Sequence, residues 1–350
     1  MKKLLLFVLC LLQSCQLYHY KRLKLPEHQD KKFNLKSVVL TGYGRYSYSQ
    51  ESVEQYIEYL QDINANSASL LITCFTDNSS SSNVFCSEYD TPTISEIEYA
   101  SQKIQNAGLL LNLRIYIDLQ SKEWRCHWNP KDKEKAFMAL ENVLFKYVTL
   151  AEKVKAESII IGAEYCHLTE PKYTKYWTGL IEKIRTVYKG KISYGANWNI
   201  PYKSKFSSEY EQIQFWDSLD WIGIDYYWPL NKRYSPTTKN LHFHHQNNLV
   251  LIEDFAQKKK KNVLITEVGF PIEDGGSYNP FDWTLKGPIN PEEHFENHKA
   301  FLEEYKKRNN IYGAFFWHLN PRRMFRQKGI VPNKKALKQS WSDNENTNNN

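Results

Sequence analysis

The apolar residues of this chain fall into two alternating kinds of segment. Short, nearly continuous apolar runs, rich in β-branched residues, are each followed by a longer stretch in which apolar residues recur at helical spacing. Because continuous apolar runs suit strands buried on both faces, this alternation predicts repeated βα units around a parallel sheet. The predicted strands are residues 35–43, 68–75, 109–118, 158–164, 192–198, 221–227, 263–268 and 312–319.

Several helix ends are recognisable between these strands. Asn290 is a candidate N-cap, with Pro291 at the first helical position and Glu293 three residues after the cap. Gly108 and Gly190 each close a helix just before a strand. Eight strands predict an α/β fold, a single-domain (β/α)8 TIM barrel. The alternative, a doubly wound open sheet, usually has fewer strands and a Gly-rich phosphate loop, which this sequence lacks.

The first residues are typical of an export signal. Lys2 and Lys3 precede the apolar stretch 4–12, which is too short to span a bilayer. The sequence LQSC at 12–15 resembles the lipobox of bacterial lipoproteins, in which the cysteine, here Cys15, becomes the lipidated first residue of the mature chain. An ordinary signal peptide is the alternative. We therefore expect an exported bacterial protein, lipid-anchored in the cell envelope or secreted.

These patterns divide the chain into four parts. They are a signal peptide with its lipobox at 1–15, a polar tether at 16–33, the barrel domain at 34–341 and a polar, Asn-rich, disordered tail at 342–350.

Composition narrows the function classes. With 350 residues, 41% of them apolar, the chain can bury a large core and is not globally disordered. The net charge of +7 is carried by scattered residues, and the one dense run, Lys258 to Lys261, lies where a helix is expected to end. We expect no nucleic-acid partner and a monomeric protein.

The cysteines do not indicate a disulfide scaffold or a metal cluster. Besides Cys15, the exported part retains Cys74, Cys86, Cys126 and Cys166, with no C-x-x-C pair. One or two bridges are compatible with an oxidising compartment, for instance Cys74 with Cys86, but the spacing does not decide this.

Two glutamates end predicted strands. In a (β/α)8 barrel the active site lies at the carboxyl ends of the strands, where Glu164 closes the fourth strand and Glu267 the seventh. These positions face one another across the mouth, and retaining glycoside hydrolysis needs two carboxyl groups about 5–5.5 Å apart. Strand order alone leaves open which glutamate is the acid/base and which the nucleophile.

Tryptophans accompany these carboxylates. Indole offers an apolar face and one N–H donor, which suits a sugar ring. Trp216 and Trp221 sit in apolar context and are expected to pack in the core. Six others are predicted at the mouth of the barrel: Trp124, Trp128, Trp198, Trp228, Trp283 and Trp317.

Four segments carry a resemblance to a known family. KISYGANW at 191–198, FWDSLDWIGIDYYWPL at 215–230, TEVGF at 266–270 and IDLQSKEWR at 117–125 resemble motifs of glycoside hydrolase family 113. That family belongs to clan A, and its characterised members are mainly β-1,4-mannanases. The resemblance extends from about Ser37 to Leu319 and is most specific in the second of these segments.

The resemblance implies roles for individual residues. Glu164 matches the acid/base, Glu267 the nucleophile and Tyr227 the tyrosine that hydrogen-bonds the nucleophile. Trp317 matches the aromatic platform under the reacting sugar. The other expected substrate-binding residues are Asp118, Trp124, Arg125, Asn197, Trp198, Asp225 and Trp228.

The sequence departs from the family pattern next to the acid/base. Ala163 precedes Glu164, where many clan A enzymes have asparagine and family 113 typically has threonine. We therefore hypothesise that the Asn197 amide binds the sugar 2-hydroxyl instead. Cys166 and His167, which follow the acid/base, are also unexpected in a mannanase and bear on the substrate more than on the chemistry.

The sequence thus predicts a cofactor-independent retaining hydrolase of a β-linked polysaccharide, with β-1,4-mannan as the first candidate. The rivals are a catalytically silent glycan-binding surface lipoprotein and a hydrolase of glucan, xylan or a wall glycan. A metal site is not expected, since His242, His244 and His245 have no carboxylate close in sequence.

Overall fold

The computed structural model describes residues 34–203, 207–231, 238–321 and 328–342. The predicted export signal, Cys15, the tether and the tail from residue 343 onward lie outside these residues. Ser342, predicted to begin the tail, is instead the last residue of a helix. Its hydroxyl donates to the carbonyl of Lys338 and accepts a hydrogen bond from the Asn64 amide, so the ordered domain extends one residue further than predicted.

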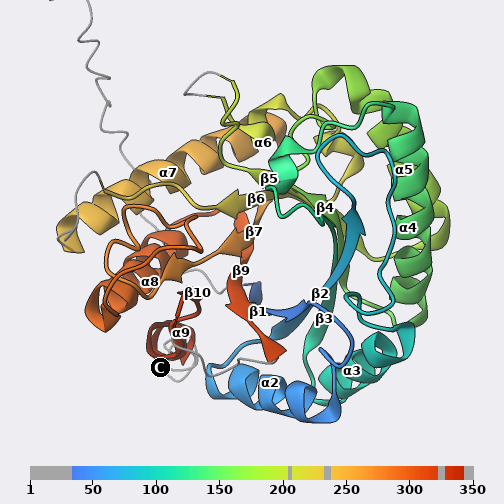
Figure 1. Cartoon of the computed structure of the whole chain (residues 1–350). Coiled ribbons are helices and arrows are strands. Elements are labelled where there is room, and N and C mark those ends of the chain that lie inside the picture. The colour runs from blue at the N-terminus through green and yellow to red at the C-terminus, as the bar shows by residue number, and fades with distance from the viewer. Residues whose placement is uncertain (1–33, 204–206, 232–237, 322–327, 343–350) are drawn as a thin grey trace, which may run out of the picture. The chain divides into compact units, whose positions relative to one another are not determined.

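Eight parallel strands close into a barrel, which confirms the predicted fold class (Figure 1). Each strand pairs with the next along the chain, and the last pairs with the first. Every predicted strand end lies within one residue of the observed end. The strands are β1 (Leu35–Gly42), β2 (Ser67–Thr76), β3 (Leu110–Leu119), β4 (Ser158–Ala163), β5 (Lys191–Asn197), β6 (Ile222–Tyr226), β7 (Val263–Val268) and β9 (Ile311–Leu319).

Helices surround the barrel, and their starts follow from capping residues. The Asn290 side chain accepts from the backbone N–H of Glu293, as predicted, and Thr93 forms a capping box with Glu96. The long helices are α2 (Gln50–Asp62), α3 (Ile94–Asn106), α4 (Lys133–Lys153), α5 (Thr174–Val187), α7 (Thr238–Lys259) and α8 (Pro291–Lys306). Short ones are α6 (Glu209–Gln212) and the 3-10 turns η1 (Arg125–His127), η2 (Pro171–Tyr173) and η3 (Trp216–Ser218).

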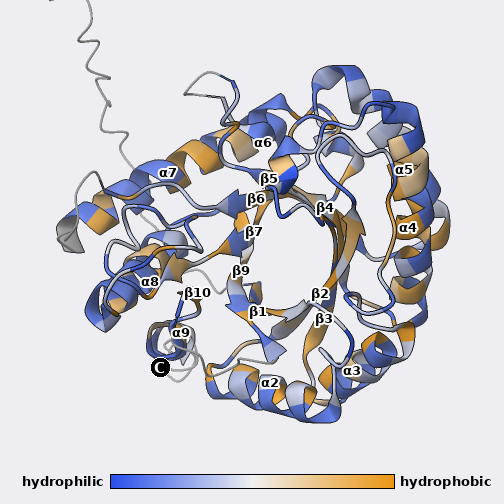
Figure 2. Ribbon diagram, viewed as in Figure 1, coloured by the Kyte–Doolittle hydropathy of each residue, from blue (hydrophilic) through white to orange (hydrophobic). Residues whose placement is uncertain are grey.

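Two apolar clusters stabilise this arrangement. The larger lies between strands and helices, and α4 and α5 carry hydrophobic and hydrophilic residues around their circumference accordingly (Figure 2). The smaller cluster takes side chains from β1, β2, β3, β4, β7 and β9, including Leu71, Ile160, Leu264 and Phe315. Because these residues fill the barrel from several strands, the interior is packed and the site is confined to its mouth.

A small appendage after β7 was not predicted. Strand β8 (Phe270–Pro271) pairs antiparallel with β10 (Ile330–Val331), and α9 (Lys334–Ser342) follows. Trp341 of α9 is 1% exposed and packs edge-on against Phe316 of β9, at 5.8 Å between ring centroids. Two-residue strands show no periodicity, which is why sequence patterns miss them.

Two disulfides fix loops near the carboxyl ends of the strands, one of them to strand β2 itself. Cys74 is bonded to Cys86, the pair that the spacing left undecided, and Cys126 is bonded to Cys166. The second bridge joins the loop after β3 to the loop after β4 and explains the unexpected Cys166. Within the described part of the chain, no helix is long and apolar enough to cross a bilayer.

Candidate active site

Glu164 lies directly after β4 in an uncommon backbone conformation. Its φ is 60°, in the left-handed region that non-glycine residues rarely adopt. Hydrogen bonds from neighbouring strands hold the turn: the Glu164 N–H donates to the Gly195 carbonyl at 2.9 Å, and the Tyr165 N–H donates to the Tyr194 hydroxyl at 2.6 Å. Such a conformation persists only where its surroundings enforce it, and here it fixes the carboxyl group at the barrel mouth.

Three side chains donate to the Glu164 carboxylate. Oε2 accepts from Trp124 Nε1 at 2.6 Å and from Arg125 Nη2 at 3.1 Å. Oε1 accepts from Asn197 Nδ2 at 2.8 Å. Arg125 is itself fixed by Asp118, whose Oδ1 accepts from Nη1 at 2.7 Å. Glu164 is 6% exposed, so it reaches solvent only through the mouth.

A different set of donors holds Glu267. Oε1 accepts from the Tyr116 hydroxyl at 2.5 Å and from Arg114 Nη2 at 3.1 Å, and Oε2 accepts from the Tyr227 hydroxyl at 3.0 Å. Arg114 is fully buried and also donates to the Thr266 carbonyl. Glu267, 3% exposed, is therefore fixed from β3 and β6 as well as from its own strand.

Burial and mutual repulsion shape the protonation of this pair. Burial raises the pKa of Glu164, the Arg125 guanidinium lowers it, and the charge of Glu267 raises it again. Burial also raises the pKa of Glu267, against the opposing charges of Arg114 and Arg125. Two buried carboxyl groups that repel one another favour sharing a single proton, which is the state that acid/base chemistry on a glycosidic bond needs.

A third acid, Asp225 of β6, is the register partner of Glu267 on β7. Asp225 has no exposed surface, and its Oδ1 accepts from the Thr266 hydroxyl at 2.6 Å. Burial, followed by the charges of Glu267 and Glu164, raises the pKa of Asp225 well above its usual value. When Asp225 is protonated, it adds no negative charge near Glu164 and Glu267.

Comparison with known proteins identifies the family of this chain. The model of Glycoside Hydrolase Family 113 matches residues 41–335, most of the chain. The chain belongs to this family. It is a glycoside hydrolase acting on O-glycosyl bonds. No curated sequence matches it.

Two solved structures of the same family and one of another mannanase share the fold. A GH113 β-1,4-mannanase solved as a complex is 19% identical with a TM-score of 0.77, over 89% of this chain and 99% of that one. The GH113 β-mannanase AaManA from Alicyclobacillus acidocaldarius, in complex with ManMIm, is 17% identical with a TM-score of 0.74, over 90% of this chain and 98% of that one. An endo-β-1,4-mannanase from Thermotoga petrophila has a TM-score of 0.57 at 12% identity, over 91% and 78%.

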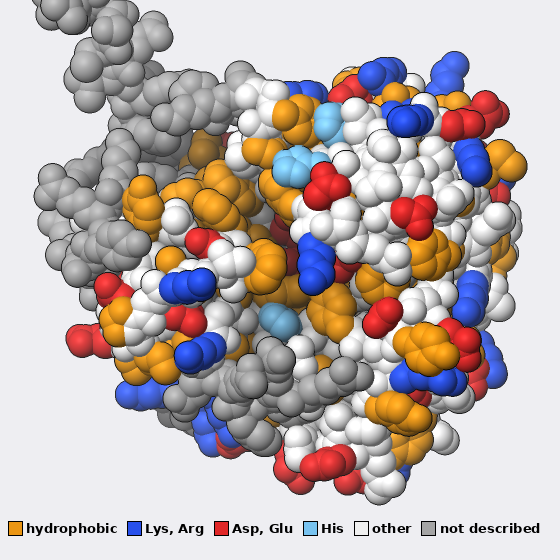
Figure 3. Space-filling model, viewed as in Figure 1, with side chains coloured by type: hydrophobic (Ala, Val, Ile, Leu, Met, Phe, Trp, Pro, Cys, Tyr) orange, Lys and Arg blue, Asp and Glu red, His pale blue; other side chains and the backbone are white. Residues whose placement is uncertain are grey.

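Two predicted aromatic residues flank the carboxylates of this family 113 hydrolase. Trp124 is 37% exposed and contacts Glu164 directly. Trp317 stacks on Tyr116, with ring centroids 6.4 Å apart, so it reaches Glu267 through that ring. In the space-filling view of this face, hydrophobic side chains gather at a central hollow (Figure 3).

Trp198 and Trp228 lie together rather than beside the glutamates. Their ring centroids are 5.7 Å apart, and Phe281 packs on Trp198 at 6.1 Å. Both tryptophans are half-buried and come from the ends of β5 and β6. Trp283 is 74% exposed.

The prediction that Trp128 lines the mouth is wrong. Its side chain is fully buried, packs edge-on against Tyr165 at 5.4 Å and donates from Nε1 to the Ser81 carbonyl. The physical reason is that the indole N–H donates to a carbonyl of the loop after β2. The ring is therefore buried between that loop and its own loop after β3.

Sequence reasoning missed two residues that contact Glu267. Arg114 and Tyr116 share one face of β3, and the Tyr116 ring lies between two cations, with Arg114 at 5.0 Å and Arg125 at 4.6 Å from its centroid. The available signal was the alternation of Asn112, Arg114 and Tyr116 in an otherwise apolar strand, because a charged residue in a buried strand needs a partner inside the barrel.

Glu209 was also missed. It lies in the short helix α6, fully buried, and its carboxyl group accepts from the Asn197 N–H at 2.7 Å, the Tyr194 hydroxyl at 2.8 Å and the Thr169 hydroxyl at 2.9 Å. Burial raises the pKa of Glu209 to about 8. Since Asn197 in turn donates to Glu164, Glu209 helps to hold the residue that binds the Glu164 carboxylate.

The histidines of α7 have structural partners. His245 is buried, and its Nδ1 lies 2.9 Å from the Tyr226 hydroxyl. His242 pairs with Glu303 and Glu304 of α8, which lie far from it in the sequence. No group of three or more metal-ligating residues is found among the described residues.

Proposed function

We propose that this family 113 enzyme is a retaining hydrolase that cleaves β-1,4-linked mannan, with Glu164 as acid/base and Glu267 as nucleophile. The observation that carries the proposal is the pair of nearly buried carboxyl groups at the ends of β4 and β7, each held by its own set of donors. Retaining hydrolysis uses two such groups, one to protonate the leaving oxygen and one to attack the anomeric carbon.

In the first step, Glu267 attacks the anomeric carbon. Among the described residues, only Tyr227 donates to Oε2, whereas Oε1 accepts two hydrogen bonds, so Oε2 keeps a lone pair for the attack. Glu164 meanwhile protonates the leaving oxygen. Its Oε1 accepts one hydrogen bond and Oε2 accepts two, so Oε1 has room for the proton. The bond to the leaving sugar breaks and a covalent glycosyl-enzyme forms.

In the second step, Glu164 acts as base. Esterification removes the negative charge of Glu267, one of the influences that raise the pKa of Glu164. The pKa of Glu164 therefore falls, and its carboxylate takes a proton from the water that attacks the glycosyl-enzyme. This step releases the sugar with its original anomeric configuration and returns the proton to Glu164.

Mannan as the substrate is supported by the family and by the names of its solved members, which are β-1,4-mannanases. Trp317, which stacks on the buried Tyr116, supplies aromatic surface near Glu267, where the reacting sugar would lie. The Asn197 amide commits one N–H to Glu164 and its oxygen to the Asn199 N–H. Our hypothesis that it also binds the sugar 2-hydroxyl rests on its second N–H.

Reducing-sugar release tests this function. Wild type and Glu267→Gln are incubated with mannan, glucomannan, β-glucan and xylan, and both proteins are checked for folding. We expect release from mannan by the wild type alone. If the wild type cleaves only glucan or xylan, that glycan replaces mannan as the proposed substrate. Full activity of Glu267→Gln would refute the mechanism. A folded wild type that releases nothing but retains oligosaccharide would support the glycan-binding lipoprotein instead.

We further propose export and lipid anchoring through Cys15. This rests on the sequence at 12–15 and on the polar segment that follows it. Wild type and Cys15→Ser are expressed in a bacterial host with a lipoprotein pathway and fractionated. Membrane association that is lost in Cys15→Ser supports the anchor, whereas soluble wild type contradicts it.

A further inference from the structure

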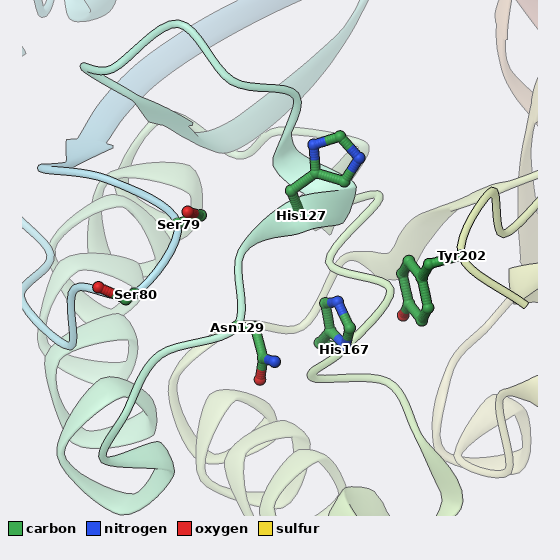
Figure 4. Close-up of a pocket in the computed structure, with 6 residues that line it drawn as sticks. All are labelled: Ser79, Ser80, His127, Asn129, His167 and Tyr202. Carbon is green, nitrogen blue, oxygen red and sulfur yellow. The ribbon is translucent and has the colours of Figure 1, made fainter.

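A second hollow lies beside the mouth of the barrel. It has a volume of about 420 Å³ and is lined by Ser79, Ser80, His127, Asn129, His167 and Tyr202 (Figure 4). Small-molecule sites commonly enclose about 300–1,000 Å³, so this space can take a sugar unit. Its residues come from the loops after β2, β3, β4 and β5, and none comes from β7, which carries Glu267.

One aromatic ring separates this pocket from the proposed acid/base. Trp124 donates to Glu164 Oε2 at 2.6 Å, and the same indole packs edge-on against His127 with ring centroids 5.8 Å apart. In retaining hydrolysis the acid/base faces the leaving group, since it protonates the leaving oxygen. The pocket is lined by loops on the Glu164 side of the site and by none from β7, which is the arrangement expected of a space for the leaving chain.

The lining suits a neutral, hydroxyl-rich ligand. Among the described residues, the ring nitrogens of His127 and the hydroxyl of Tyr202 have no hydrogen-bond partner, so they are available to sugar hydroxyls. His167 stacks on Tyr202, with ring centroids 3.9 Å apart and planes 6° apart. No Asp, Glu, Lys or Arg of the described part of the chain lines the space. Burial lowers the pKa of His167, which favours its neutral form.

A disulfide fixes the two imidazoles. Cys126 and Cys166 are bonded and have no exposed surface, and His127 and His167 follow them directly in the chain. The bridge therefore holds the loops after β3 and β4 at a constant separation under the pocket. A site built in this way pays little ordering entropy when a ligand binds.

We infer that this pocket binds a neutral sugar unit of the leaving chain, beyond the sugar that receives the proton from Glu164. The inference rests on the proposed function and deepens it. The occupant is a pyranose that places hydroxyls on His127 and the loop serines and an apolar face or edge on the His167–Tyr202 stack.

Two substrates separate this pocket from the catalytic centre. Mannohexaose has a leaving chain long enough to fill the pocket, whereas the leaving group of 4-nitrophenyl β-mannobioside ends at one ring. We compare kcat/KM for both in wild type, Tyr202→Ala, His167→Ala and a control, Tyr89→Ala. Tyr89 is 71% exposed and does not line the pocket.

The ratio of kcat/KM for mannohexaose to that for the aryl substrate should fall about tenfold in both pocket variants, the effect of losing one ring contact to a sugar. Tyr89→Ala should keep the wild-type ratio. An unchanged ratio in both pocket variants, or an equal loss on both substrates, would overturn the inference.

Binding separates failure of the inference from failure of the proposed function. Mannotriose is titrated into Glu267→Gln while the His127 imidazole resonances are followed by NMR, assigned with His127→Gln. We expect a shift that weakens in Tyr202→Ala, even if the wild type hydrolyses neither substrate. In that event the hydrolase proposal fails and the pocket stands. Absence of any shift overturns the pocket.

Discussion

Arg125 lies between two acids, with Nη2 3.1 Å from Oε2 of Glu164 and Nη1 2.7 Å from Oδ1 of Asp118. Its positive charge favours the ionised form of Glu164 and so lowers the pKa of that carboxyl group, against the effect of burial. In the proposed mechanism, Arg125 thus prevents Glu164 from holding its proton too tightly to donate it.

Replacing Arg125 by glutamine should therefore raise the pKa of Glu164. Because Glu164 must be protonated to act as the acid, the alkaline limb of the kcat/KM profile should move to higher pH, while the maximum falls. Arg185→Gln is the control, since Arg185 pairs with Asp220 away from the mouth. An alkaline limb that stays in place or moves to lower pH in Arg125→Gln would contradict this role.

Tyr227→Phe should slow catalysis without unfolding the protein. The variant loses the 3.0 Å hydrogen bond to Glu267 Oε2. A hydrogen bond to a charged group contributes about 1.5–3 kcal/mol, which corresponds to a loss of about 10- to 150-fold in kcat/KM. Tyr176→Phe, on the surface of α5, is the matched control. If both variants retain wild-type kinetics, Tyr227 does not support the nucleophile.

The two disulfides should differ in their effect on catalysis. In the loop-entropy account, removing Cys126–Cys166, which spans 40 residues, costs about 4 kcal/mol, and removing Cys74–Cys86, which spans 12, costs about 3 kcal/mol. Only the former joins the loops that carry Arg125 and Glu164. Paired Cys→Ala variants should both show a lower Tm, but only the Cys126/Cys166 pair should lose kcat by more than about tenfold, the loss expected when supporting positions shift by about 1 Å. Equal kcat losses would refute the positioning role.

Glu209 should make stability depend on pH. Burial raises its pKa from 4.5 to about 8 in the folded protein. The folded state therefore keeps a proton that the unfolded chain has already lost. The stability is complete below about pH 4.5 and declines as the pH rises to about 8, by roughly 1.4 kcal/mol per pH unit for this group.

Glu209→Gln removes that titration and keeps most of the shape. Urea unfolding between pH 5 and 8 should show the wild type losing stability relative to the variant as the pH rises. A difference between the two proteins that is constant with pH would show that Glu209 is ionised in the folded state.

Much of the architecture could be predicted because it depends on local pattern. Apolar runs located all eight strands, and the barrel topology then placed Glu164 and Glu267 at one mouth. The supporting residues could not be predicted in this way. Glu209 contacts Asn197 from a four-residue helix. Trp128 points inward because its indole N–H donates to the Ser81 carbonyl, which lies 47 residues away in the sequence. Periodicity gives the direction of side chains in strands and helices but not in loops.

Arg114 illustrates a signal that was present but not used. It is the one charged residue in the stretch 110–117. Its opposite charge is Glu267, which is distant in the sequence but lies 3.1 Å away in the fold. A buried charge in a barrel strand implies an opposite charge across the interior. This rule links Arg114 of β3 to the Glu267 carboxylate of β7.

Trapping the covalent intermediate tests the central claim most directly. The enzyme is incubated with a 2-deoxy-2-fluoro-β-mannosyl fluoride, which slows release of the glycosyl-enzyme, and the labelled peptide is identified by mass spectrometry. We predict a single fluoromannosyl group esterified to Glu267, with none in Glu267→Gln. A label on Glu164, or an active enzyme that takes up no label and releases the inverted anomer, would contradict the mechanism.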